Sequence, residues 1–136
     1  MNIDRYRQQH ADIMTSVAGL RALVQAGIGA HADDIAQRII AMSTHIKFHL
    51  AAEDAVLYPA LQAAPDPAVA ALSRRYQDEM AGIAGAYADF ARKWRVGTQI
   101  AAAPEAFRDE ANAVFKALHD RIQKENRELY PAAQRL

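Results

Sequence analysis

The sequence predicts an all-α fold, an antiparallel four-helix bundle that runs up, down, up and down. Three observations support this prediction. Alanine is abundant, and the alternation of apolar and polar residues that is typical of a β-strand is missing. Turn signals fall in three places, at residues 27–29, at residues 65–67 and from Val96 to Pro104. The segments between them carry apolar residues in alternating steps of three and four, which is the period of one helix face.

The turn signals place four helices at residues 3–26, 32–63, 67–95 and 103–129. Short connections make sequential helices antiparallel neighbours. Asp66 followed by Pro67 indicates an N-cap with proline in the first turn, and Gly97 indicates a helix stop. Because no boundary between domains is visible, we expect residues 1–136 to form a single domain.

Each predicted helix has one inward face, and polar residues interrupt these faces. In the second helix the inward positions are Ile35, Ile39, Met42, Ile46, His49, Glu53 and Val56, and in the fourth they are Phe107, Ala111, Val114, Leu118, Arg121 and Glu125. His10 interrupts the first helix in the same way. Burying an ionised group without a partner costs several kcal/mol. We therefore expect these polar residues to satisfy one another, to hold an ion, or both.

The spacing of the polar residues indicates two kinds of pair. His49 and Glu53 are four residues apart, so their side chains stack on one face and suit two ligands of one metal ion. An imidazole and a carboxylate, without thiolates, suit iron, manganese or zinc. Arg121 and Glu125 have the same spacing, which for these residue types favours an ion pair.

One motif resembles a known family. The stretch from His45 to Pro59 contains His49-x3-Glu53-Asp54-x2-Leu57-Tyr58-Pro59 and is similar to the second helix of hemerythrin-like, or HHE cation-binding, domains. His10 near the start of the chain, and Glu125 before Leu129-Tyr130-Pro131, match the pattern of that family. The resemblance covers nearly the whole chain.

The resemblance implies a four-helix bundle in which two iron ions are bridged by two carboxylates and capped by histidines. By position, His10 and His49 correspond to the histidines of one iron, and Glu53 and Glu125 to the bridging carboxylates. The ligands of the other iron are replaced, at positions Tyr76, Met80 and Arg121. Arginine does not lose its proton to bind a metal, and methionine is a poor ligand for a hard ion. The resemblance thus implies half a site, with four ligands for one divalent ion.

Two functions remain open. One is a small bacterial-type hemerythrin-like protein that binds one ion (iron, or manganese or zinc) and acts in O2 or NO sensing, redox chemistry or iron handling. The other is a metal-free bundle that works as an interaction or signalling module, with Arg121 in the lost metal position. A third idea, di-metal catalysis, needs a second ion, for which Tyr76, Glu79 and His45 are the candidate ligands. No nucleophile–base pair or phosphate-binding glycine loop is present, so we expect no enzyme.

Composition narrows the class of protein. Sixteen Lys and Arg balance sixteen Asp and Glu, which gives no support to a nucleic-acid partner. The apolar runs are short and broken by charges, so we expect no membrane span. The first ten residues carry charges where a signal peptide is apolar, and a cytoplasmic location is expected. Zero cysteines exclude disulfides and thiolate ligands. The sequence identifies no protein partner and fits either a monomer or a homodimer.

Overall fold

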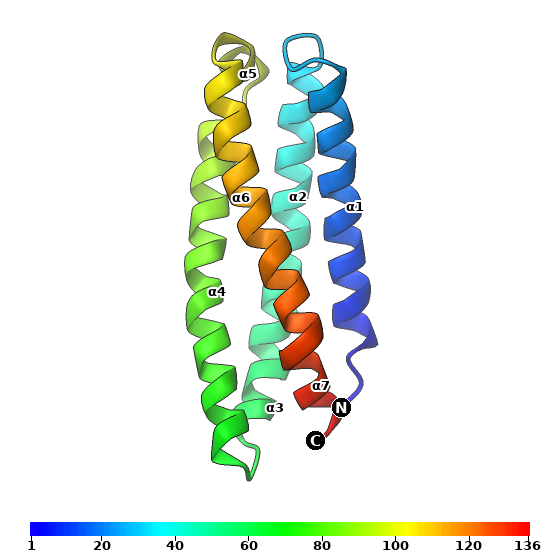
Figure 1. Ribbon diagram of the computed structural model, residues 1–136, viewed down its shortest axis with the longest axis vertical. Coiled ribbons are helices and arrows are strands. Elements are labelled where there is room, and N and C mark those ends of the chain that lie inside the picture. Colours follow the sequence, from blue (N-terminus) through cyan, green and yellow to red (C-terminus); the bar gives the residue numbers. More distant parts are fainter.

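Helices make up almost the whole chain, and the computed structural model describes all 136 residues (Figure 1). The first part contains α1 (Asp4–Ala26), α2 (Ala32–Ala52), the π-helical turn η1 (Glu53–Leu57) and α3 (Tyr58–Gln62). The second part contains α4 (Pro67–Lys93), α5 (Gly97–Ala102), α6 (Pro104–Lys124), the π-helical turn η2 (Glu125–Leu129) and α7 (Tyr130–Gln134). No strand is present, so the predicted all-α class is confirmed.

The long helices lie side by side as a bundle (Figure 1). The connection from α1 to α2 and the short helix α5 lie at one end of the bundle, whereas the connection from α3 to α4 and both chain termini lie at the other. α5 was not predicted, and Gly97, which was expected to stop a helix, is its first residue. A Cβ at Gly97 would lie 2.9 Å from the backbone nitrogen of Asp33, so glycine allows α5 to approach the start of α2 closely.

Two connections between helices have the local structure that their sequences favour: the one after α1 and the one before α4. Gly27 has a φ of 129°, in the left-handed region that favours glycine, and its N–H donates to the carbonyl of Val24. Asp66 caps α4, because its Oδ1 accepts a hydrogen bond of 2.9 Å from the backbone nitrogen of Ala68. The predicted N-cap at Asp66, with Pro67 in the first turn, is confirmed.

Both π-helical turns begin at a glutamate and end just before a Tyr-Pro sequence. In each turn the tyrosine N–H donates to the carbonyl of the glutamate five residues earlier, Tyr58 to Glu53 and Tyr130 to Glu125. The proline that follows has no N–H, and its ring crowds the carbonyl four residues before it. A turn widened by one residue accommodates this crowding, and such turns often lie at functional sites. The helix predicted at residues 32–63 therefore contains an extra residue in one of its turns.

The extra residue changes which side chains face the core. Val56, predicted to point inward, is 47% exposed, whereas Leu57 is fully buried. The prediction for Val56 was wrong because it continued the α-helical period through a turn that is not α-helical. In α6 the core also includes Phe115, which was missed beside the half-buried Val114.

Two hydrophobic clusters fill the bundle. The larger one has 20 buried residues and includes Ile13, Ile46 and Ile122. The smaller one has 11 and includes Tyr6 and Leu129. His10 lies between Tyr6 and Ile13, His49 between Ile46 and Ala52, and Glu125 between Ile122 and Leu129, in each case between members of the two clusters. These polar residues therefore form a polar layer across the core. None of the helices combines the length and the apolar character that crossing a membrane requires.

Candidate metal centre

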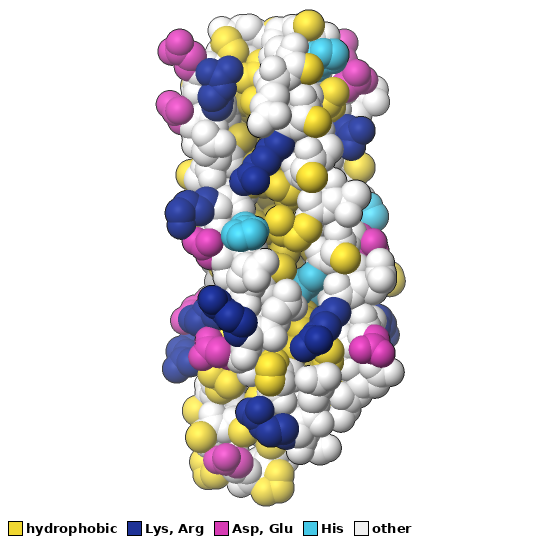
Figure 2. Space-filling model, turned by 45° about the vertical axis from the view of Figure 1, so that its right-hand side comes forward, with side chains coloured by type: hydrophobic (Ala, Val, Ile, Leu, Met, Phe, Trp, Pro, Cys, Tyr) yellow, Lys and Arg dark blue, Asp and Glu magenta, His cyan; other side chains and the backbone are white.

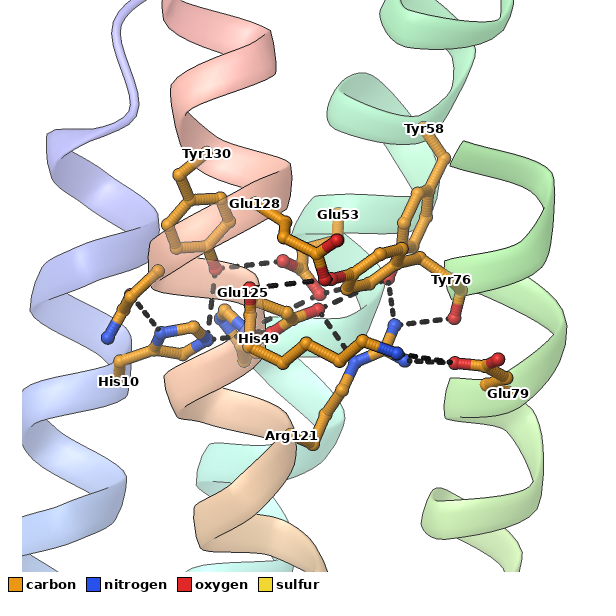
Figure 3. Close-up of polar contacts among 12 residues, drawn as sticks. His10, His49, Glu53, Tyr58, Tyr76, Glu79, Arg121, Glu125, Glu128 and Tyr130 are labelled. Carbon is orange, nitrogen blue, oxygen red and sulfur yellow. Dashed lines mark hydrogen bonds and ion pairs between the residues drawn. The ribbon is translucent and has the colours of Figure 1, made fainter. Parts of the chain in front are cut away.

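Four buried ligand-type side chains meet in the polar layer (Figure 3). His10 comes from α1, His49 from the last turn of α2, Glu53 from the start of η1 and Glu125 from the start of η2. Each is at most 3% exposed, and one ligand atom of each lies within 4.8 Å of the others. The structure thus brings together the four residues that the sequence proposed as a ligand set.

The two π-helical turns place the glutamates opposite the histidines. Glu125 Oε1 lies 2.9 Å from His10 Nε2 and 3.9 Å from His49 Nε2. Glu53 Oε1 lies 3.4 Å from His49 Nε2. The centroids of the two imidazole rings are 4.6 Å apart. Both Nε2 atoms and both carboxylates therefore face one small volume between the helices.

Two amide side chains hold the outer nitrogens of the imidazoles. Gln9 Oε1 lies 2.7 Å from His49 Nδ1, and Asn126 Oδ1 lies 3.0 Å from His10 Nδ1. An amide oxygen only accepts hydrogen bonds, so each Nδ1 carries the proton and each Nε2 of a neutral ring presents a lone pair inward. This arrangement, with the outer nitrogen held by a hydrogen bond, is typical of metal-binding histidines.

Two tyrosines complete the layer from the side of the smaller cluster. The Tyr130 hydroxyl donates to Glu53 Oε2 at 2.9 Å and lies 2.9 Å from His10 Nε2. The Tyr58 hydroxyl lies at longer range, 3.5 Å from Glu53 Oε1 and 3.4 Å from Glu125 Oε2. Burial raises the pKa of both phenols, so both remain protonated hydrogen-bond donors.

The two carboxyl groups have opposite tendencies when no ion is bound. Burial and the neighbouring charge of Glu125 raise the pKa of Glu53 well above its ordinary value. Burial also acts to raise the pKa of Glu125, but the neighbouring imidazoles of His10 and His49 and the positive charge of Arg121 outweigh it and lower that pKa to about 2. Burial lowers the pKa of His49 and so favours the neutral ring that binds metals. Two carboxylates this close need a cation or a proton between them.

Arg121 occupies the side of the layer where the resemblance places a second ion. Its Nε lies 3.3 Å from Glu125 Oε2, and its guanidinium donates to the carbonyl of Tyr76. The guanidinium also lies 4.3 Å from the centroid of the Tyr76 ring and 3.4 Å from Glu79 Oε2 at the rim. The predicted ion pair with Glu125 is confirmed. Arg121 is 3% exposed, so its fixed positive charge is part of the core.

The other replaced positions add no ligand to the centre. Tyr76 is buried in the core, and its hydroxyl donates to Glu128. Met80 is buried in the larger hydrophobic cluster. His45, one helical turn before His49, is exposed, and so is His119. The candidates for a second ion are therefore either exposed or engaged with other side chains.

Sequence reasoning missed the supporting residues. Gln9 and Asn126 are each adjacent in sequence to a proposed ligand, but each holds a histidine of a different helix. Tyr58 and Tyr130 belong to a Leu-Tyr-Pro repeat, which follows Glu53 at residues 57–59 and Glu125 at residues 129–131, and the sequence alone indicated no role for their hydroxyls. The repeat is the sequence signal from which a role for the two tyrosines at the site could have been predicted.

The donor set fits a divalent transition-metal ion. His49 Nε2 is buried and has no hydrogen-bond partner, and such an atom is costly unless something else binds it. Two imidazoles and two carboxylates are ligands that iron, manganese and zinc accept. Fold and site together define a helical-bundle protein with a buried histidine and carboxylate centre, a class in which helices supply metal ligands from facing positions.

Comparison with known proteins identifies the family. The model of the hemerythrin HHE cation-binding domain matches residues 1–133, so the chain belongs to the hemerythrin HHE family. Members of this family bind metal ions, and the site described above could hold one. No curated protein and no solved structure matched the chain.

Proposed function

We propose that this protein binds one divalent metal ion, iron in the first instance, through His10, His49, Glu53 and Glu125. The observation that carries the proposal is the buried cluster whose ligand atoms lie within 4.8 Å of one another. It is supported by the amide oxygens that orient both imidazoles and by the unpartnered Nε2 of His49. Manganese and zinc suit the same donors.

The proposed role is the binding of a small ligand such as O2 or NO, in sensing, redox chemistry or iron handling, without catalysis. A bound iron ion would supply a redox-active centre with positions left over for that ligand. The chain supplies the surroundings. The hydrophobic clusters on both sides exclude water, and the Tyr130 hydroxyl holds Glu53 in place. The Arg121 guanidinium beside Glu125 provides the positive charge that a second ion brings to a two-iron centre.

Metal analysis of protein purified without chelators tests the proposal. We expect about one ion per chain in the wild type, after reconstitution with Fe²⁺ if necessary, and only traces in His49→Ala. His45→Ala is the matched control, because His45 is an exposed histidine on the same helix, one turn earlier. Wild-type protein that binds no iron, manganese or zinc above the level of His49→Ala contradicts the proposal.

A metal-free interaction module is the second candidate, and Arg121 favours it. With Glu125 paired to Arg121 and Glu53 protonated because of its raised pKa, the buried layer is neutral without any metal. In that case calorimetric titration with Fe²⁺, Mn²⁺ and Zn²⁺ gives no heat of binding. Arg121→Gln then destabilises the protein, whereas in a metal-loaded protein its effect is smaller, because the ion stabilises both carboxylates.

A further inference from the structure

A groove lies between α1 and α6, away from the metal centre. Its volume is about 520 Å³, within the range of pockets that hold small organic ligands. Its floor consists of Leu20, Ala111 and Phe115, which are at most 5% exposed and belong to the larger hydrophobic cluster. Figure 2 shows this face, where a strip of apolar side chains runs between the helices with Lys and Arg side chains along its edges. The groove thus opens directly onto the core.

The edges of the groove carry positive charge and no negative charge. Arg21 comes from α1 and Arg108 from α6, and no acidic side chain lines the groove. Neither arginine has an ion-pair partner within 4 Å. The amides of Gln25 and Asn112 add hydrogen-bonding groups on the same two helices. Two guanidinium groups, one on each side, suit the recognition of an anionic head group.

We propose that this groove binds a free medium-chain carboxylate, with the carboxylate between Arg21 and Arg108 and the hydrocarbon chain on the apolar floor. Charge complementarity selects an anion, and the floor selects a hydrocarbon chain rather than a small inorganic anion. The site is separate from the metal centre, because Arg21 follows His10 by 11 residues, or about 16 Å along α1. The proposal therefore does not depend on whether a metal is bound.

The test is calorimetric titration of the full chain with decanoate, kept well below its micelle concentration. We expect binding of one decanoate per chain. The affinity should fall at least tenfold in the double variant Arg21→Gln, Arg108→Gln. Arg75→Gln is the matched control: an exposed arginine on α4 without an ion pair, which should leave the affinity unchanged. Both kinds of substitution are on the surface, and circular dichroism verifies that the variants fold.

Three further ligands separate the parts of the proposal. Acetate tests the hydrocarbon chain and decanol tests the charge, and we expect both to bind at least tenfold more weakly than decanoate. Decyl phosphate tests the head group and should also bind more weakly. The proposal is overturned if decanoate does not bind, if it binds at several sites, or if the double variant binds it as the wild type does. Equal binding of acetate or of decyl phosphate also overturns it, since the site then recognises a simple anion or a phosphate ester.

Discussion

Replacing Tyr130 by phenylalanine removes one hydroxyl from the polar layer and keeps the ring. That hydroxyl donates to Glu53 Oε2 at 2.9 Å and lies 2.9 Å from His10 Nε2. Tyr130 is fully buried, so no water can take the place of the lost donor. Leaving a buried hydrogen-bond acceptor without its donor costs about 1–3 kcal/mol. We therefore expect Tyr130→Phe to lower the free energy of unfolding of the metal-free protein by about 2 kcal/mol.

Tyr58→Phe is the matched control, because Tyr58 is as deeply buried as Tyr130 and occupies the same place in the other copy of the repeat. Its hydroxyl makes only long contacts, at 3.4 and 3.5 Å, which are weak hydrogen bonds. We expect a loss of about 0.5 kcal/mol. Urea unfolding followed by circular dichroism, with a chelator present, measures both variants. Equal losses, or a Tyr130→Phe variant as stable as the wild type, would refute the assignment of the hydrogen bond to Tyr130.

Three other predictions concern charge, ligand orientation and packing. Glu53→Gln should stabilise the metal-free protein, and the gain should grow as the pH rises above about 4.5, the ordinary pKa of a glutamate. The reason is that the raised pKa keeps a proton on Glu53 in the folded protein, whereas the unfolded chain releases it. A stability difference in urea unfolding that is the same at pH 5 and pH 8 would count against this. Asn126→Leu should weaken metal binding by about 10- to 100-fold in competition with a chelator, because His10 loses the partner of its outer nitrogen, and wild-type affinity would contradict the role of the amide. In thermal unfolding, Gly97→Ala should lower the free energy of unfolding by about 1–3 kcal/mol, because the added Cβ meets Asp33. Gly85→Ala, where the added Cβ has open space around it, should raise the free energy of unfolding by about 0.5–1 kcal/mol. A change of the same sign in both variants would refute the packing argument.

The long helices and the polar layer could be predicted because both follow from the period of single helices. Ile35, Ile39 and Met42 are fully buried, as the apolar period indicated. A histidine and a glutamate that interrupt such a period are visible in the sequence before any packing is known. Their meeting across helices follows once the helices are antiparallel and the residues lie at the same depth.

What could not be predicted depends on contacts between helices or on departures from α-helical geometry. The apolar pattern of the sequence does not reveal the π-helical turns, so Val56 was wrongly predicted to face the core. The short α5 has six residues, too few for an amphipathic period to show. Gln9 and Asn126 lie beside the inward faces, and only the three-dimensional structure pairs each with a histidine of another helix.

The π-helical turns also change what the insertion or loss of a residue does to this chain. Deleting one residue from α2 before His49 would rotate everything on one side of the deletion by about 100° and turn ligands away from the core. Deleting one residue within η1, for example Ala55, would instead restore an α-helical turn and keep the flanking helices in phase. Chain length can therefore vary at these two turns without moving the histidines. A shortened turn would bring the proline ring against the backbone of the preceding turn and so strain the helix at the point where Glu53 or Glu125 is held.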